Sequence, residues 1–192
     1  MKEKLITAIG IHPAEVSYPL LKAILTGSEP GDIRQEAAFW ISQATISADA
    51  VSLLSKQAQS DKSDDVRDKC IFALSQMETE LATEALITIA RTRVDEEIRK
   101  KAMFWLGQKA SEKAVATLKE LVEDKDTDIQ KSALFALTQL QNNSGLIDVI
   151  RIAQTHRNPA VRKEAIFWLG QSEDERALDR SEERRVGKEC RL

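Results

Sequence analysis

One short phrase recurs five times in this chain at nearly constant spacing, and this repeat constrains the fold more than any other feature. The phrase is an Ile or Val, usually an Arg, then a small residue, a Phe and a Gln, and its copies begin at Ile33, Val66, Ile98, Ile129 and Val161. The copies are 33, 32, 31 and 32 residues apart. A period in this range is typical of a solenoid, in which equivalent modules stack side by side. Because solenoids offer extended surfaces, the pattern favours binding over catalysis.

Each copy is predicted to lie on a helix, which we call helix B. Counted from the first apolar residue as position 0, apolar residues recur at positions 4, 7 and 8 and therefore share one helical face, as in Ile33, Ala37, Trp40 and Ile41. In four copies, a residue able to cap the first turn stands three residues before position 0. These predicted caps are Ser63, Asp95, Asp126 and Asn158.

A second apolar stripe precedes each helix B and predicts a partner, helix A, as in Leu86, Ile89 and Ala90. Neither helix can bury its stripe alone, so neighbouring hairpins must stack. The predicted fold is all-α: a right-handed α-α superhelix of repeats about 32 residues long. The array is predicted over residues 1–179, with six B helices and five complete A helices. Met1 falls at position 0 of a further helix B and Glu175–Asp179 begin another helix A, so we expect both ends to be truncated.

The last residues are predicted to be a non-native tail. Residues 180–190 read RSEERRVGKEC and resemble a translated sequencing adapter, so residues 180–192 are expected to be disordered or a fraying helix. The tail holds five basic and three acidic residues, which leaves 23 basic and 28 acidic residues in the array and a net charge of −5. Without Cys190, Cys70 is the one remaining cysteine and cannot form an internal disulfide.

The phrase itself carries a family resemblance. The pattern is an Asp, then Ile or Val followed by Arg, then an Ala, and finally Leu-Gly. The copy that begins at Ile98 contains the last parts of this pattern as Ile98-Arg99, Ala102 and Leu106-Gly107. The chain thereby resembles HEAT-repeat proteins, of the short HEAT-like type also found in phycobilin lyases. The resemblance implies an α-solenoid and structural pairing between acidic residues and Arg near the start of each helix B. The Arg residues at this position are Arg34, Arg67, Arg99 and Arg162, and the ladder is expected to be interrupted where Gln130 replaces Arg and Ala160 replaces the acid.

The Phe and Gln residues of the phrase are the candidate binding residues. Position 6 lies roughly 150° from the centre of the buried arc, on the same face as position 10. The sequence therefore predicts an apolar ladder flanked by amides along the concave groove that B helices usually line, suited to a peptide or protein partner. The ladder would consist of Phe39, Phe72, Phe104, Phe135 and Phe167, with Gln43, Gln76, Gln108, Gln139 and Gln171 beside it.

A purely structural interpretation of the same residues stays open at this stage. Each Phe could pack between adjacent B helices, and the Gln side chains could bond neighbouring loops. Position 7 alternates between Trp and Ala, so the large residues are expected to be structural and to pack against helix A. These residues are Trp40, Trp105 and Trp168.

Other functions have weaker support in the sequence. A basic cluster at Arg99, Lys100, Lys101, Lys131 and Lys163 could contact nucleic-acid backbone, but acidic residues interleave with it, and nucleic acid is not the expected partner. A bilin-type lyase subunit is the alternative that the family resemblance suggests, although no residues for that chemistry are identifiable.

The sequence predicts no catalytic residue, metal site or cofactor. His12 and His156 fall in separate loops without Cys ligands, and Cys70 occupies a small buried position on its helix. No apolar run approaches the length of a membrane span. No signal peptide or disulfide pair is evident, which favours the cytoplasm, while the expected truncation leaves the compartment undecided.

Overall fold

A computed structural model describes residues 2–92, 95–109 and 111–172, and these residues form helices and no strand. The predicted all-α class is confirmed. The chain divides into two compact units, an N-terminal unit of residues 1–109 and a C-terminal unit of residues 110–192, which are described separately. The part of the sequence beyond Ser172 lies outside the described residues, including the predicted start of another helix A and the predicted tail at 180–192.

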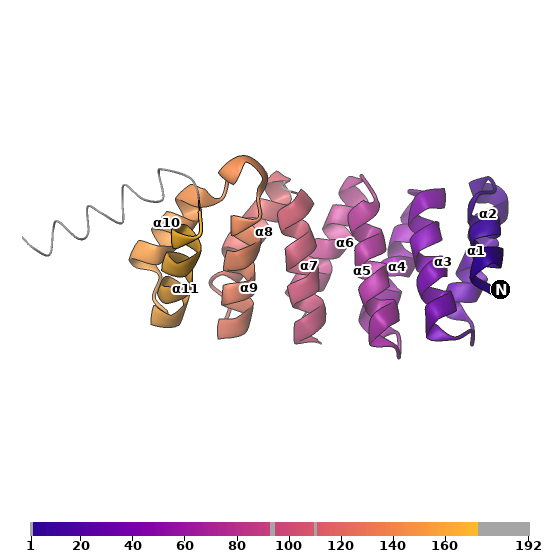
Figure 1. Cartoon of the computed structure of the whole chain (residues 1–192), viewed down its shortest axis with the longest axis horizontal. Coiled ribbons are helices and arrows are strands. Elements are labelled where there is room, and N and C mark those ends of the chain that lie inside the picture. Colours follow the sequence, from indigo (N-terminus) through magenta and orange to yellow (C-terminus); the bar gives the residue numbers. More distant parts are fainter. Residues whose placement is uncertain (1, 93–94, 110, 173–192) are drawn as a thin grey trace, which may run out of the picture. The chain divides into compact units, whose positions relative to one another are not determined.

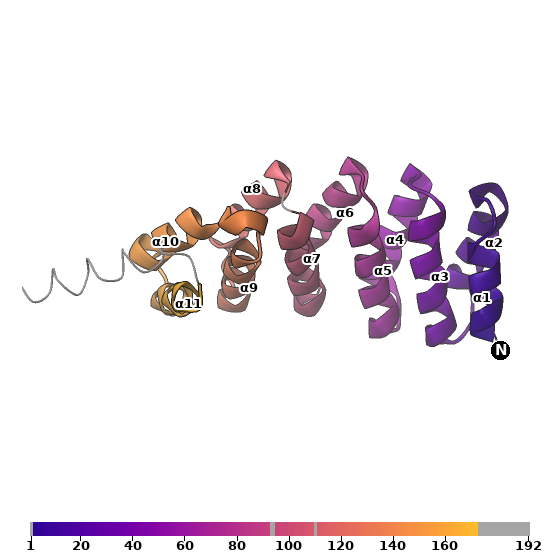
Figure 2. The same cartoon turned by 45° about the horizontal axis from the view of Figure 1, so that its top comes forward.

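The N-terminal unit is a two-layer stack of helical hairpins (Figures 1 and 2). Its helices are α1 (Lys2–Gly10), α2 (Ala14–Thr26), α3 (Gly31–Ala44), α4 (Ala48–Ser60), α5 (Asp64–Gln76), α6 (Glu80–Arg91) and α7 (Glu96–Lys109). The odd-numbered helices are the B helices, and each packs against the next B helix in the series. The helices α2, α4 and α6 are the A helices, and α4 also packs against α6. This arrangement is the predicted repeat of helix A followed by helix B.

The C-terminal unit repeats the same hairpin twice. Its helices are α8 (Glu112–Leu121), α9 (Thr127–Thr138), α10 (Leu146–Thr155) and α11 (Pro159–Gly170), with the short 3₁₀ turn η1 (Gln141–Asn143) after α9. Here α9 and α11 are B helices that pack on each other, and α8 and α10 are their A helices. Asn143 in η1 takes a positive φ of 52°, a left-handed conformation that Asn tolerates better than most residues.

The apolar stripes predicted from the sequence form the core. In the N-terminal unit, Leu21, Leu25, Leu54 and Leu86 of the A helices are fully buried or nearly so, and so are the B-helix residues Ile41, Ile71, Leu74 and Leu106. Burial of each such side chain contributes about 1.5–3 kcal/mol. No helix of the described residues is long and apolar enough to cross a membrane.

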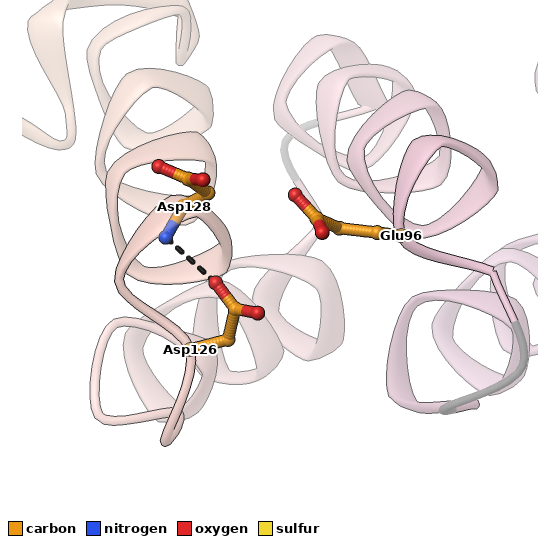
Figure 3. A group of neighbouring side chains, drawn as sticks. All are labelled: Glu96, Asp126 and Asp128. Carbon is orange, nitrogen blue, oxygen red and sulfur yellow. Dashed lines mark hydrogen bonds between the residues drawn. The ribbon is translucent and has the colours of Figure 1, made fainter.

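Three of the four predicted helix caps are confirmed. Asp95 Oδ1 accepts from the Ile98 amide at 3.1 Å, Asn158 from the Ala160 amide at 3.0 Å, and Asp126 from the amides of Asp128 and Ile129. Figure 3 shows the 2.8 Å bond from Asp128 to Asp126. Ser63 occupies the predicted N-cap position of α5, but its side chain makes no capping bond. Its amide instead donates to Asp61 Oδ1 at 2.9 Å.

The A helices have a capping rule of their own that the sequence reasoning missed. The hydroxyls of Ser47, Thr79 and Ser111 each accept from the amide three residues later, at 3.2–3.3 Å. Each hydroxyl therefore satisfies one of the free amides in the first turn of α4, α6 and α8. The pattern of Ser or Thr followed three residues later by Ala was present in the sequence and could have located these helix starts.

A polar ladder joins successive repeats, but its acidic members differ from those that the family resemblance implied. Arg34 pairs with Asp61 in the loop before α5, and Arg67 pairs with Asp95, the cap of α7, so each guanidinium reaches an acid that precedes the next B helix. Arg67 also pairs with Asp64 in its own helix, at 3.3 Å. The Arg34–Asp61 pair is buried, with side chains 5% and 3% exposed. Arg162 instead donates to the His156 carbonyl oxygen at 2.7 Å.

The predicted interruption at Gln130 is filled by a neutral pair. Gln130 Oε1 accepts from Asn158 Nδ2 at 2.8 Å, at the same two repeat positions that Arg67 and Asp95 occupy in the N-terminal unit. Gln130 Nε2 donates to the Asp124 carbonyl oxygen at 2.6 Å, which fixes the amide so that its oxygen faces Asn158. Both members of the pair are thus neutral at this step of the ladder.

This pairing predicts a coupled effect. Asn158→Asp is expected to destabilise the C-terminal unit by about 1–2 kcal/mol, because a carboxylate would face the Gln130 oxygen with no hydrogen between them. Adding Gln130→Arg should recover most of the loss, since it recreates the pair formed by Arg67 and Asp95. Urea unfolding of the two single variants and the double variant measures this coupling. Additive losses would show that the two side chains act independently.

A second prediction concerns pH. The bond from the Ile98 amide, together with the Arg67 guanidinium, lowers the pKa of Asp95 against the opposing effect of partial burial. A lowered folded-state pKa stabilises the fold above the unfolded pKa of about 3.9, and this stabilisation is lost as the pH falls through the folded-state value. Asp95→Asn should therefore be less stable than wild type at neutral pH. The difference in free energy of unfolding between the two proteins should shrink as the pH falls. Unfolding by urea across that pH range tests this, and a gap independent of pH would contradict it.

Candidate functional site

The Phe residues of the N-terminal unit form a row across three neighbouring B helices. Phe39 and Phe72 stack with ring centroids 6.5 Å apart and an interplanar angle of 16°. Phe72 also meets Trp105 edge to face at 5.3 Å, and Phe104 meets the same indole at 5.1 Å. All three Phe side chains are half-buried. The rings therefore pack against one another and still present part of their surface to solvent.

The Trp residues differ from the sequence prediction. All three are half-buried rather than buried, and their ring partners are Phe residues on B helices. Trp40 lies directly over Gly10 on α1, where an added Cβ would come within 2.2 Å of the indole. The small residue that makes room for this Trp therefore lies on the preceding B helix.

The C-terminal unit contains the remaining two Phe residues. Phe135 packs on Trp168 with centroids 4.9 Å apart, and Phe167 meets the same indole at 5.2 Å. Phe167 is 54% exposed, more than any other Phe. The same aromatic arrangement of a Trp with a Phe on its own helix and a Phe on the preceding B helix thus occurs in both units.

The predicted Gln residues lie at the ends of the B helices, and three of them are held in place by a hydroxyl. Gln43 donates to Ser42 Oγ at 3.4 Å, and Ser42 donates in turn to the Phe39 carbonyl oxygen at 2.7 Å. Gln76 with Ser75 and Gln139 with Thr138 repeat this relay, each with a Gln bond of 3.2 Å and a hydroxyl bond of 2.7 Å. Gln108 and Gln171 follow Gly107 and Gly170, so they have no preceding hydroxyl.

The relay has a chemical consequence for the two exposed amides Gln43 and Gln76. Their NH₂ groups are engaged by the hydroxyls, whereas no donor lies on either Oε1 atom within residues 2–92 and 95–109. Each side chain therefore presents a hydrogen-bond acceptor to solvent. The sequence reasoning identified the Gln positions but missed the Ser and Thr residues that orient them, although Ser42, Ser75 and Thr138 recur at one repeat position.

A lysine completes this surface. Lys69 Nζ lies 5.8 Å from the ring centroid of Phe39 and 5.3 Å from that of Phe72, within the range of cation–π contacts. The sequence reasoning did not single out this residue. We refer to the surface formed by Phe39, Phe72, Phe104, Trp105, Gln43, Gln76 and Lys69 as the aromatic face of the N-terminal unit.

Two of the five basic residues considered for nucleic-acid binding are paired with acidic side chains, and a third is buried. Lys100 bonds to Glu96 and Glu97 at 2.5 and 3.1 Å, and Lys101 pairs with Asp68. Arg99 is buried and donates to the Ala90 carbonyl oxygen at 2.9 Å. Paired cations release fewer counterions on binding a phosphate backbone than free ones. This geometry gives no support to nucleic-acid binding by the N-terminal unit.

Family comparisons agree with this architecture. The family described as HEAT repeats matches residues 18–102 and 83–155, and the family described as PBS lyase HEAT-like repeat matches residues 161–180. The chain belongs to the HEAT-repeat family. The resemblance inferred from the phrase is thereby confirmed, and with it the interpretation of the fold as a solenoid of helical hairpins. No curated protein matches the chain.

Solved structures of similar fold include a lyase subunit and a designed binder. A chain in the complex of CpcE and CpcF of phycocyanin lyase from Nostoc sp. PCC7120 is 23% identical, with 80% of this chain and 97% of that chain covered and a TM-score of 0.53. A designed armadillo repeat protein in complex with the peptide (KR)4 is 20% identical, with 88% and 90% covered and a TM-score of 0.45. At these identities the likeness concerns the fold alone.

The Cys and one of the two His residues described in this HEAT-repeat protein are engaged in packing. Cys70 is buried, and desolvation raises the pKa of its thiol, so it is a poor nucleophile. His156 is also buried, with Nε2 3.1 Å from the Val122 carbonyl oxygen, and Nδ1 accepts from the Asn158 amide at 3.1 Å. His12 is exposed and stands apart in the loop after α1. Asp126 and Asp128 of Figure 3 lie at the start of α9, where Asp126 acts as a cap.

Proposed function

We propose that this HEAT-repeat protein is an interaction scaffold that binds a peptide or protein segment along the aromatic face of its N-terminal unit. The observation that carries the proposal is the continuous row of half-buried rings from Phe39 to Trp105, beside the outward acceptors of Gln43 and Gln76. Apolar surface supplies affinity and regularly spaced polar groups supply register, as in other peptide-binding grooves. The whole chain is proposed to work by recognition rather than by chemistry.

The rings suit binding because they are already ordered. Their mutual contacts hold each side chain in one conformation before a partner arrives, which lowers the entropic cost of association. Aromatic residues in such positions often dominate binding energy. A partner that covers the exposed edges would bury them without moving the B helices.

The test compares two variants in a selection for binding peptides. Random linear peptides displayed on phage are selected against the full chain, and the affinity of an enriched peptide is then measured. Phe72→Ala with Phe104→Ala is expected to weaken that binding by more than about tenfold, as loss of two hot-spot residues would. Leu81→Ala removes an exposed apolar residue on the A helix α6, outside the aromatic face, and should leave binding unchanged.

Helical content separates the two interpretations of the rings. The Phe72→Ala and Phe104→Ala double variant should keep the circular dichroism spectrum of the wild type. If the double change unfolds the N-terminal unit, the rings are core residues and the proposal fails. It also fails if no peptide is enriched.

A bilin-type lyase subunit is the second candidate, because the chain is similar in fold to a chain of the phycocyanin lyase complex. A pocket of about 390 Å³ in the C-terminal unit, lined in part by Trp168, Leu137 and Gln139, lies within the size range of small-molecule sites. Mixing the chain with a free bilin tests this candidate. A shift in the bilin absorbance that Trp168→Ala removes would favour it over a scaffold, whereas an unchanged spectrum would count against it.

A further inference from the structure

Lys69 carries a charge that no described residue of its own unit neutralises. Its side chain is half-buried over Phe39 and Phe72, and within residues 2–92 and 95–109 no carboxylate pairs with it. The neighbouring cations differ, since Lys101 is paired with Asp68 and Arg67 with Asp95. An ordered cation that is partly shielded from water by two rings interacts more strongly with an incoming anion than a solvated lysine does.

The two Gln acceptors lie at the C-terminal ends of the same two helices, one turn beyond the rings beneath Lys69. Gln43 is on α3 and Gln76 ends α5, and the two rings beneath Lys69 come from the same helices. Packed helices lie about 8–10 Å apart, a distance that roughly three residues of extended chain span. One short extended segment can therefore reach both amides and Lys69 together.

We infer that the aromatic face recognises an extended segment with an acidic side chain. The Asp or Glu carboxylate accepts from Lys69 Nζ, and the main chain on either side donates N–H groups to the Oε1 atoms of Gln43 and Gln76. The chemistry is complementary at each point, because two acceptors meet two donors and the unpaired cation meets an anion. This inference rests on the proposed function and adds the class of partner to it.

Charge around Lys69 is mixed, which provides a matched control. Glu36 occupies on α3 the repeat position that Lys69 occupies on α5, and it has no ion-pair partner among the described residues. Glu36→Gln therefore removes one charge from the same surface without touching the cation. Lys69→Met keeps the apolar stem over the rings and removes only the charge.

The experiment is the phage selection against the full chain, followed by binding measurements on the enriched peptide. We expect Asp or Glu to be enriched at one fixed position, and replacement of that residue by Asn to weaken binding to wild type about tenfold, as loss of a charged hydrogen bond would. The same replacement should change binding to Lys69→Met by less than about twofold. The same replacement should weaken binding to Glu36→Gln about as much as it weakens binding to wild type. A selection against Lys69→Glu should enrich Lys or Arg at that peptide position instead of Asp or Glu.

The outcomes separate this inference from the proposal beneath it. Enriched peptides that depend on Phe72 and Phe104 but show no acidic preference would overturn the inference and leave the scaffold function standing. An acidic preference that survives in Lys69→Met would also overturn the inference, because the anion would then contact another group. If no peptide is enriched, both the scaffold proposal and the inference of an acidic partner fail.

Discussion

Asp61→Asn is expected to lower the free energy of unfolding of the N-terminal unit by about 3 kcal/mol, because it leaves the buried Arg34 guanidinium without its counter-charge. Both side chains of the pair are at most 5% exposed, so water cannot replace the lost partner. Arg34 would keep one bond, from Nε to the Glu29 carbonyl oxygen at 3.1 Å, which does not neutralise its charge. Because domains are stable by only about 5–15 kcal/mol, a loss of this size is large.

Urea unfolding followed by far-ultraviolet circular dichroism measures the effect. The matched control is Asp49→Asn, which removes the carboxylate of an exposed pair with Lys22 whose side chains are 44% and 61% exposed. This control should change stability little, since water screens the pair. The double variant Arg34→Met with Asp61→Leu should recover part of the loss, because apolar residues remove the buried charge altogether. Equal losses for Asp61→Asn and Asp49→Asn would contradict the prediction.

Gly145→Ala is expected to destabilise the C-terminal unit by about 3 kcal/mol, the upper range for a steric clash in a packed site. An added Cβ would lie 2.1 Å from the Leu137 carbonyl oxygen, a backbone atom that cannot rotate away. Gly145 directly precedes α10 with a φ of −83°, so the requirement is for space and not for an unusual backbone conformation. The change would separate α9 from the start of α10.

The control for this prediction is Gly170→Ala. A Cβ there meets nothing within 4 Å, so the variant should be as stable as wild type or slightly more stable, by up to about 1 kcal/mol. With Trp40 and Trp105 replaced by Phe, the fluorescence of Trp168 reports on the C-terminal unit during unfolding. Similar curves for the two Gly variants would show that α10 shifts to accommodate the methyl group.

Much of the candidate site could be predicted from the repeat, but its details could not. The five Phe and five Gln positions followed from spacing alone, and the structure orients Gln43 and Gln76 outward as acceptors. Lys69 was not predictable, because the sequence does not show which of several surface lysines lacks a carboxylate within reach. The same limit applies to the hydroxyls of Ser42 and Ser75, whose role depends on bonds across a single helical turn.

The polar ladder shows where sequence reasoning stops. The replacement of Arg by Gln at position 130 suggested a break, yet Gln130 bonds Asn158 in the next repeat. Pairing partners of this kind lie 27 or 28 residues apart, and their identity depends on which loop residue faces which helix. Asp95 lies three residues before position 0 of its repeat and Asp61 lies five residues before it, yet the two acids serve the same purpose.

The sequence by itself determined the helical repeat, its period and the residues of the core, because a helix with one apolar stripe must bury that stripe against a neighbour wherever the pattern recurs. Only the tertiary structure decided which half-buried rings touch, where each Trp finds room and which charges remain unpaired. These features depend on distances between helices that are close in space and about 32 residues apart in the chain, and residue identity and spacing do not fix such distances.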